Sequence, residues 1–405
     1  MMKNNFYKLE NPIQNYAWGS KTSISTLFGI DNKHQEPQAE IWMGAHPNGC
    51  SKVIVEGGES VLLSTLINED KIGVLSKSTA EYYGELPYLF KVLAADQALS
   101  VQVHPNKEEA EQGFIREEAQ GVDRLASNRN YRDANHKPEL VYALTSYQAM
   151  NGFRSFKEIL ALFTQLLSEA EMPAVDRLVD SFKHSMTPKG LEAFFTGVLS
   201  LSGDEKHQSI CALLEHASKH QRPEIDNDLN ALVLELAKTY PNDIGLFSPF
   251  MLNVLTLKPG EAMYLDARTP HAYLKGTGLE IMANSDNVLR AGLTPKHIDV
   301  VELTKCTLFE EKPSRSLLLE PEIEGSKLSY PVPVQDFKFD CFIQADALVL
   351  AVDSAEIVFA IDDDALLEHV SGETMLINRG ESAFIPAYAK EYKLTSRGRI
   401  ARAYN

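Results

Sequence analysis

The sequence predicts a mainly β protein with an α-helical insertion and more than one domain. Residues up to about 153, and again from about 250 onward, show the alternating or compact apolar patterns of short strands. Between residues 154 and 245, apolar residues instead recur at helical spacing. A chain of 405 residues is also too long for one ordinary hydrophobic core. We therefore expect two or three domains, with an all-helical insertion between β regions.

Two strands and one helix are expected in the first β region. Residues 89–93 form a compact apolar run, and residues 99–104 alternate apolar and polar side chains, as half-buried strands do. Pro105 ends the second strand, because proline cannot donate to a central ladder. A charged helix is expected from residue 107 to about residue 120, with short strands and loops elsewhere.

The insertion is expected to contain several short helices. Ser155 and Glu158 have the spacing of a capping box before the first periodic run. Similar runs follow at residues 174–182, 190–201, 208–216 and 228–236. Four histidines among these polar helix residues are interpreted as surface side chains: His184, His207, His216 and His220. A metal role would need carboxylates nearby at matching positions, and the pattern does not supply a convincing set.

The C-terminal β region contains a weak internal repeat. Residues 257–265 resemble residues 377–385 in a strand–turn–strand pattern that includes a Gly-Glu pair. Continuing the register without gaps places Glu391 where the first copy has His271. We therefore expect two β units of which only the first carries chemistry.

Composition argues against several kinds of partner. The formal net charge of -17 disfavours nucleic acid or an anionic membrane as the main partner. The first residues lack the apolar run of a signal peptide, and no run is long enough to span a bilayer. Four cysteines lie far apart without C-x-x-C spacing, which suits reduced core thiols in a cytoplasmic protein: Cys50, Cys211, Cys306 and Cys341.

Two distant segments carry a metal-binding pattern. Gln102 and His104 lie two residues apart on the predicted strand, so both side chains leave the same face. Glu139 can supply a carboxylate oxygen and His271 a second imidazole, which together suit zinc or another divalent first-row metal. Gln102 has the least chemical support, because an amide is an unusual ligand. An ordinary structural role also stays open for a single histidine before proline, such as His104.

These segments together resemble type I mannose-6-phosphate isomerase (phosphomannose isomerase). The run Tyr131-x-Asp133-x-Asn135-His136-Lys137-Pro138-Glu139 matches one family motif in full. Residues 271–296, which are dense in polar and charged groups, match the other motif nearly throughout. Supporting matches lie at residues 15–19, 39–44, 87–91 and 102–105. The last hundred or so residues carry no comparable signature.

The resemblance implies a cupin-type β-barrel catalytic domain, a helical domain and a second cupin-like barrel. It also implies one zinc ion and the reversible conversion of mannose 6-phosphate to fructose 6-phosphate. The implied zinc ligands are Gln102, His104, Glu139 and His271. The expected division is a catalytic barrel from residues 1–153 and 246–312, a helical insertion at 154–245, and a C-terminal barrel without metal at 313–405.

The implied reaction moves a proton between C2 and C1 through an enediol, and it needs a cation for the phosphate or the developing negative charge. Arg290 matches a residue usually marked as part of the active site, and its permanent charge suits either task. Ser100 and Lys296 are expected phosphate contacts. The proton carrier stays open among four candidates: His136, Lys137, Glu280 and Asp286.

Two other functions fit part of the pattern. A cupin-type iron oxygenase would need only two histidines and one carboxylate. The extra Gln102 and the basic residues argue against this alternative. A non-catalytic sugar-binding paralogue is disfavoured for the first unit, because every motif residue is retained. Asp286 and Asn287 can equally form a turn, and His34 and His46 receive no role.

Overall fold

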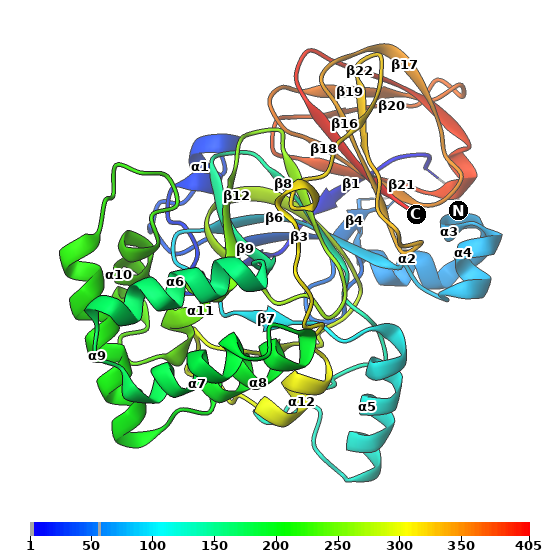
Figure 1. Cartoon of the computed structure of the whole chain (residues 1–405). Coiled ribbons are helices and arrows are strands. Elements are labelled where there is room, and N and C mark those ends of the chain that lie inside the picture. The colour runs from blue at the N-terminus through cyan, green and yellow to red at the C-terminus, as the bar shows by residue number, and fades with distance from the viewer. Residues whose placement is uncertain (1–3, 56–57) are drawn as a thin grey trace.

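The computed structural model describes residues 4–55 and 58–405, and it confirms a sheet-rich protein with a helical insertion. A ten-stranded sheet lies in the middle of the molecule. The green helices of the insertion lie on one side of it, and the orange and red C-terminal strands lie on the other (Figure 1). Among the described strands, neither large sheet closes on itself. The two-barrel arrangement therefore stays a prediction.

Strand β12 (His271–Ala283) is the hub of the central sheet. Its later part pairs antiparallel with both β6 (Tyr88–Ala95) and β8 (Glu139–Ala143). Its first residues pair with β7 (Gln102–Val103) and β9 (Tyr147–Phe153). The other strands are β2 (Ile13–Gln14), β3 (Glu40–Met43), β10 (Leu252–Leu257), β11 (Ala262–Leu265) and β13 (Leu289–Arg290). This hub brings the two motif segments together.

The predicted strand at residues 99–104 is confirmed only as the short β7. The backbone N–H groups of Leu99 and Val101 donate to Tyr273 and Gly292, which prevents one continuous ladder with a single neighbour. The prediction that Gln102 and His104 point to the same face is nevertheless confirmed. Val101 and Val103 are buried against the insertion, so residues 102 and 104 point the other way.

The insertion is all helical, as predicted. It contains α6 (Phe156–Glu169), α7 (Pro173–Lys183), α8 (Pro188–Leu199), α9 (Gly203–His220) and α10 (Leu229–Thr239). The predicted capping box opens α6, because Ser155 Oγ accepts from the Glu158 N–H at 3.2 Å and Glu158 Oε2 accepts from the Ser155 N–H at 3.1 Å. The core of the insertion is continuous with the sheet, since Phe153 packs against Phe195.

The second β unit combines C-terminal strands with strands from the start of the chain. Its nine-stranded sheet has the order β14-β15-β16-β23-β18-β21-β1-β4-β5, and a four-stranded sheet has the order β17-β22-β19-β20. Its strands are β1 (Tyr7–Glu10), β4 (Lys52–Ile54), β5 (Ser60–Leu62), β14 (Glu322–Glu324), β15 (Lys327–Tyr330), β16 (Lys338–Phe342), β17 (Ala345–Ala351), β18 (Glu356–Ala360), β19 (Ala365–Glu368), β20 (Thr374–Ile377), β21 (Ser382–Ile385), β22 (Glu391–Ser396) and β23 (Ile400–Tyr404). Because Tyr7 pairs with Phe384, the two ends of the chain share one sheet.

The internal repeat is present as two similar turns. Gly260 and Gly380 both adopt positive φ, at 94° and 83°. Glu261 Oε2 accepts from the Lys258 N–H at 2.8 Å, and Glu381 Oε2 accepts from the Asn378 N–H at 2.8 Å. The predicted register also holds, because His271 and Glu391 are the first residues of β12 and β22.

Outside the insertion, the sequence patterns predicted one helix and did not predict several shorter ones. The predicted helix at 107–120 is confirmed as α5 (Lys107–Ala119). The first β region also contains α1 (Ser23–Phe28), α2 (Leu63–Glu69), α3 (Lys71–Leu75) and α4 (Lys77–Tyr82), and α12 (Val300–Lys305) follows the central sheet. The unpredicted helices α1–α4 and α12 have seven residues or fewer each. They are too short to establish the periodicity that predicts a helix.

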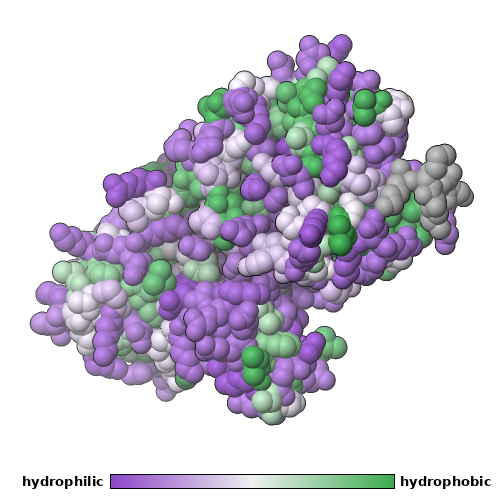
Figure 2. Space-filling view, turned by 90° about the vertical axis from the view of Figure 1, so that its right-hand side faces the viewer, coloured by the Kyte–Doolittle hydropathy of each residue, from purple (hydrophilic) through white to green (hydrophobic). Residues whose placement is uncertain are grey.

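Two interpretations of single residues were wrong. Cys211 is exposed rather than a core thiol, although all four cysteines of the described chain are free. His216 is buried rather than on the surface. No helix in the described residues is both long and apolar enough to cross a membrane. The face shown in Figure 2 is mainly hydrophilic, with apolar residues scattered over it.

Candidate metal centre and anion cavity

The predicted metal ligands converge from three separate segments. Gln102 on β7 lies directly opposite His271, the first residue of β12. His104 follows β7 immediately, and Glu139 is the first residue of β8. The nearest ligand atoms of His104, Glu139 and His271 lie within 4.8 Å of one another, and all three side chains are buried. The structure thus brings together residues that are 167 positions apart in the chain.

Both imidazoles direct the same nitrogen at one carboxylate. His104 Nε2 lies 3.3 Å from Glu139 Oε1, and His271 Nε2 lies 3.4 Å from Glu139 Oε2. The other nitrogen of each ring contacts a backbone carbonyl: His104 Nδ1 contacts Asn287 O at 2.7 Å, and His271 Nδ1 contacts Thr269 O at 2.8 Å. A carbonyl only accepts, so Nδ1 carries the proton in each ring.

This arrangement leaves a place for a cation. Burial lowers the pKa of His104 to about 4, so its ring is neutral at pH 7. With the proton on Nδ1, its Nε2 presents a lone pair to Glu139, and Nε2 has no hydrogen-bond partner among the described residues. A divalent ion between these donors removes the repulsion between lone pairs. A backbone carbonyl orienting the far nitrogen is also the usual support of a metal-binding histidine. The donor set therefore fits zinc.

Gln102 lies beside this cluster, because it pairs with His271 across β7 and β12. Its Nε2 donates to Ser100 Oγ at 3.3 Å, which leaves its amide oxygen as the acceptor. The amide oxygen is the atom of glutamine that can bind a cation. The structure thus supports Gln102 by its position opposite His271 as well as by its spacing from His104.

Two further side chains contact Glu139. Lys137 was predicted only as a proton carrier, and Tyr273 was given no role. Lys137 Nζ lies 3.1 Å from Glu139 Oε1, and the Tyr273 hydroxyl lies 2.7 Å from Oε2. Burial alone would raise the pKa of Glu139. Lys137 and the histidines outweigh burial, and the pKa falls well below its usual range. Glu139 is therefore ionised and ready to bind a cation.

Behind Glu139 lies a buried chain of charged groups. The Tyr273 hydroxyl also contacts Glu280 Oε1 at 2.9 Å, and Lys91 Nζ donates to Glu280 Oε2 at 2.9 Å. Glu40 lies 3.8 Å from Lys91. A single hydroxyl proton cannot serve two carboxylates. Burial raises the pKa of Glu280, and the neighbouring ammonium of Lys91 opposes that rise.

The remaining candidate proton carriers have other partners. His136 Nε2 lies 3.0 Å from Asp336 Oδ1, a residue of the second β unit. Asp286 Oδ1 lies 3.5 Å from His46 Nε2, and Asp286 Oδ2 accepts from Asn48 at 2.8 Å. His46, to which the sequence assigned no role, is therefore a buried partner of a motif residue.

Asn287 is a structural link between the two motifs. Its side-chain amide donates to Asp133 O at 2.8 Å and to Asn135 O at 2.9 Å. Its side-chain oxygen accepts from the Arg132 N–H at 2.7 Å, and its backbone carbonyl orients His104. Residues 286–287 lie in an irregular segment between β12 and β13 rather than in a turn. Asn287 has a structural role there, because it positions a candidate ligand.

Next to the metal centre lies a cavity of about 770 Å³ with a cationic wall. The predicted phosphate contacts Ser100 and Lys296 line it together with Gln102, Arg290 and Trp18. No carboxylate of residues 4–55 and 58–405 forms an ion pair with Arg290 or Lys296. Burial, and then mutual repulsion with nearby cations, lowers the pKa of both side chains. An anion in this cavity would relieve that repulsion.

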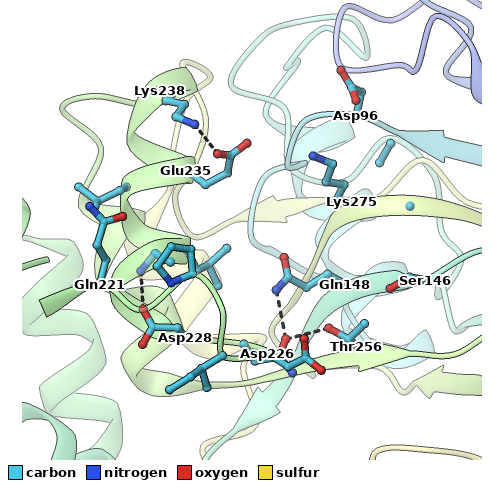
Figure 3. A pocket seen from close by; sticks show the side chains of 18 of the residues that line it. Asp96, Ser146, Gln148, Gln221, Asp226, Asp228, Glu235, Lys238, Thr256 and Lys275 are labelled. Carbon is cyan, nitrogen blue, oxygen red and sulfur yellow. Dashed lines mark hydrogen bonds and ion pairs between the residues drawn. The ribbon is translucent and has the colours of Figure 1, made fainter. Parts of the chain in front are cut away.

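A larger cavity, of about 1000 Å³, lies between α10 and the edge of the central sheet (Figure 3). Its wall has four acidic side chains and two lysines: Asp96, Asp226, Asp228, Glu235, Lys238 and Lys275. Lys238 is already paired with Glu235 at 2.6 Å. This acidic wall disfavours an anionic ligand. The cavity of about 770 Å³ beside the metal centre is therefore the better candidate for binding an anion, although it is the smaller of the two.

Lys91, Tyr273 and His46 are the main residues that sequence reasoning left without a role. The sequence could have indicated a role for Lys91, because a lysine in the otherwise apolar strand β6 requires a buried partner of opposite charge. Tyr273 lies two residues after His271, so it shares that residue's face of β12. His46 had no such signal, because its partner is 240 residues away.

Fold and site together define a class: a cupin-domain protein with a helical insertion and, beside a cationic cavity, a buried cluster of two histidines and one glutamate. Family profiles agree. Residues 6–156 match the catalytic domain of phosphomannose isomerase type I, and residues 161–252 match its helical insertion domain. Residues 326–405 match the mannose-6-phosphate isomerase cupin domain. The chain belongs to the type I phosphomannose isomerase family.

Similar proteins cover nearly the whole chain. Mannose-6-phosphate isomerase of Escherichia coli (strain K12) is 46% identical over 98% of this chain and 99% of its own length. The Rattus norvegicus enzyme is 35% identical over 94% of this chain and 93% of its own length. A solved mannose 6-phosphate isomerase structure described as holo and zinc-bound superposes with a TM-score of 0.92 at 43% identity, and covers 99% of this chain and 100% of its own.

Proposed function

We propose that this chain is a zinc-dependent isomerase that interconverts mannose 6-phosphate and fructose 6-phosphate through an enediol. The observation that carries this function is the pair of imidazole Nε2 atoms directed at the ionised Glu139, beside a cavity with uncompensated cations. The names of the similar proteins support the sugar phosphate as substrate. The zinc-bound solved structure supports the choice of metal.

The proposed zinc ligands are Gln102, His104, Glu139 and His271. When bound, zinc would supply Lewis acidity to the carbonyl and hydroxyl oxygens of the sugar. The protein holds the donors ready, since Asn287 O and Thr269 O orient the two rings. Burial of His104, Glu139 and His271 excludes competing water.

The cavity beside the metal centre provides the binding site for the phosphate group. Arg290 lies opposite Gln102 in the ladder between β13 and β7, so its guanidinium starts from a strand next to the metal centre. We assign Lys296 and Ser100 to the phosphate group, and Arg290 to the phosphate or the enediolate charge. These assignments account for the binding of an anion by a protein with a net charge of -17.

Among the four candidate proton carriers, we place Lys137 first. Its ammonium lies 3.1 Å from Glu139 and is largely buried. His136 is engaged by Asp336, and Glu280 lies behind Glu139 in contact with Lys91 and Tyr273. Asp286 is partly exposed and held by His46 and Asn48. Of these four side chains, Lys137 is the one for which a direct contact with a proposed zinc ligand is found among the described residues.

The domain division and the two-barrel fold are part of the same proposal. The matching turns at Gly260 and Gly380 support two related β units, and the three family profiles support divisions near residues 156, 252 and 326. The expected cytoplasmic location stays a prediction.

One assay tests the proposed function. Mannose 6-phosphate turnover is measured by a coupled assay for fructose 6-phosphate, with and without a metal chelator. We expect turnover that disappears with the chelator and returns with added zinc. Turnover unaffected by complete metal removal would contradict zinc dependence, and absence of turnover in zinc-loaded protein would contradict the substrate assignment. Oxygen consumption with iron but not zinc would favour the oxygenase.

A further inference from the structure

A second group of metal-binding side chains lies in the helical insertion, outside the site described above. Glu169 is the last residue of α6, and His216 and His220 lie in the last turns of α9. The ligand atoms of the three residues lie within 4.8 Å of one another. Figure 1 shows one end of α6 beside α9, on the far side of the insertion from the second β unit. Packing thus supplies a carboxylate that the sequence pattern did not indicate convincingly.

The spacing on α9 suits a metal ion. Residues four apart lie on the same face of a helix, and two histidines at this spacing are a recurrent zinc-binding pattern. Glu169 Oε2 lies 2.8 Å from His220 Nε2 and 3.7 Å from His216 Nδ1. Donors around a tetrahedral zinc are roughly 3.4 Å apart, given bonds of about 2.0–2.1 Å. Small side-chain rotations would therefore place all three donors around one ion.

His216 supplies a second, independent observation. Its side chain is only 7% exposed, and its Nδ1 has no hydrogen-bond partner in the described part of the chain. The nearest opposing group is Glu169, at a distance too long for a hydrogen bond. A buried polar atom without a partner destabilises a protein unless a ligand occupies it. The unpaired nitrogen faces the same carboxylate as His220.

The surrounding charge also favours a cation. The C-terminal ends of α6 and α9 meet at this cluster, and each helix end has a partial negative charge. The nearby ammonium of Lys219 is paired with Glu215 at 2.6 Å. The side chains of Glu169 and His220 are 43% and 44% exposed, so an ion can enter from solvent and complete its coordination with water.

We propose that Glu169, His216 and His220 form a second site for a divalent transition-metal ion, with zinc as its representative. Two imidazoles select zinc, copper or nickel over magnesium and calcium, which prefer oxygen ligands. Bound metal would tie the end of α6 to the end of α9 and thereby brace the insertion. The site does not depend on the proposed isomerase activity.

The test counts zinc. Wild-type protein and Glu169→Gln are equilibrated with the same free zinc concentration, and bound zinc per chain is measured by elemental analysis. We expect wild type to hold one more zinc ion per chain than Glu169→Gln or His220→Ala. Both changes are at half-exposed positions, which avoids the folding risk of replacing the buried His216. Glu171→Gln is the matched control and is expected to keep the wild-type count.

A second measurement separates metal binding from an ordinary ion pair. Added zinc should raise the melting temperature of wild type further than that of Glu169→Gln, while magnesium should raise neither. Equal zinc counts in wild type and Glu169→Gln would overturn the proposal. Loss of the extra ion in Glu171→Gln would also overturn it, because the binding would then not require this cluster.

Discussion

The two β units contain similar turns but different buried charge centres. In the first unit, Glu139 faces the Nε2 atoms of two buried imidazoles, and the Tyr273 hydroxyl lies between Glu139 and Glu280. In the second unit, Tyr392 donates to Glu356 Oε1 at 2.6 Å, and Arg402 Nε donates to Oε2 at 2.9 Å. Both carboxylates thus have a protein donor on each oxygen. Within the described residues, Glu139 differs because two histidines also lie within metal-binding distance of it.

The repeat register shows where this difference arises. His271 begins β12 opposite Gln102, while Glu391 begins β22 opposite Ala351. His271 is buried, and Glu391 is exposed to solvent. The positions equivalent to His271 and Gln102 thus hold an exposed carboxylate and an alanine in the second unit. The same backbone pattern supports a binding site in one unit and a self-contained ion pair in the other.

The largest effect is expected from removing a ligand of the first centre. His104→Ala and His271→Ala should each lose the zinc bound to that centre and lower turnover by at least about 1000-fold, since the strongest electrostatic contribution to catalysis disappears. Elemental analysis and steady-state kinetics measure both effects. Full zinc occupancy in both variants would show that these histidines are not ligands.

A somewhat smaller effect is expected for Arg290→Lys. The substitution keeps the charge but loses the planar guanidinium, so turnover should fall about 100- to 1000-fold if Arg290 stabilises the enediolate. Melting temperature and zinc content should stay at wild-type values. A raised KM with nearly normal kcat would assign Arg290 to ground-state binding of the phosphate instead.

The two buried tyrosines form a matched pair. Tyr273→Phe removes the hydroxyl that contacts Glu139, and it should weaken zinc binding or lower turnover by about 10- to 100-fold. Tyr392→Phe removes the corresponding contact to Glu356, and it should lower the free energy of unfolding by about 2 kcal/mol with zinc and turnover unchanged. Zinc titration, kinetics and denaturant unfolding of both variants compare the two centres. Equal effects on turnover would abolish the distinction between the units.

The smallest effect is expected for Glu391→Ala. This residue occupies the position of His271 in the repeat, but its side chain is exposed. Turnover should stay nearly unchanged, and the free energy of unfolding should shift by no more than about 0.5 kcal/mol. If turnover collapsed while fold and zinc content remained intact, the second unit would have a catalytic role.

The sequence by itself determined the helical insertion, the repeat and the segments that form the metal centre. Helix periodicity and the Ser155–Glu158 capping box are local properties, so they predict local structure directly. The two-residue spacing of Gln102 and His104 sets a shared face wherever the strand is extended, even though β7 is short.

Tertiary structure alone decided the contacts between distant segments. The pairing of Lys91 with Glu280 depends on strand register between residues 189 positions apart, and the pairing of His46 with Asp286 depends on how two loops pack. The shared sheet of Tyr7 and Phe384, and the meeting of Glu169 with His216, depend in the same way on how whole elements pack. Spacing along a chain constrains which face a side chain leaves, but only packing determines which side chain it meets.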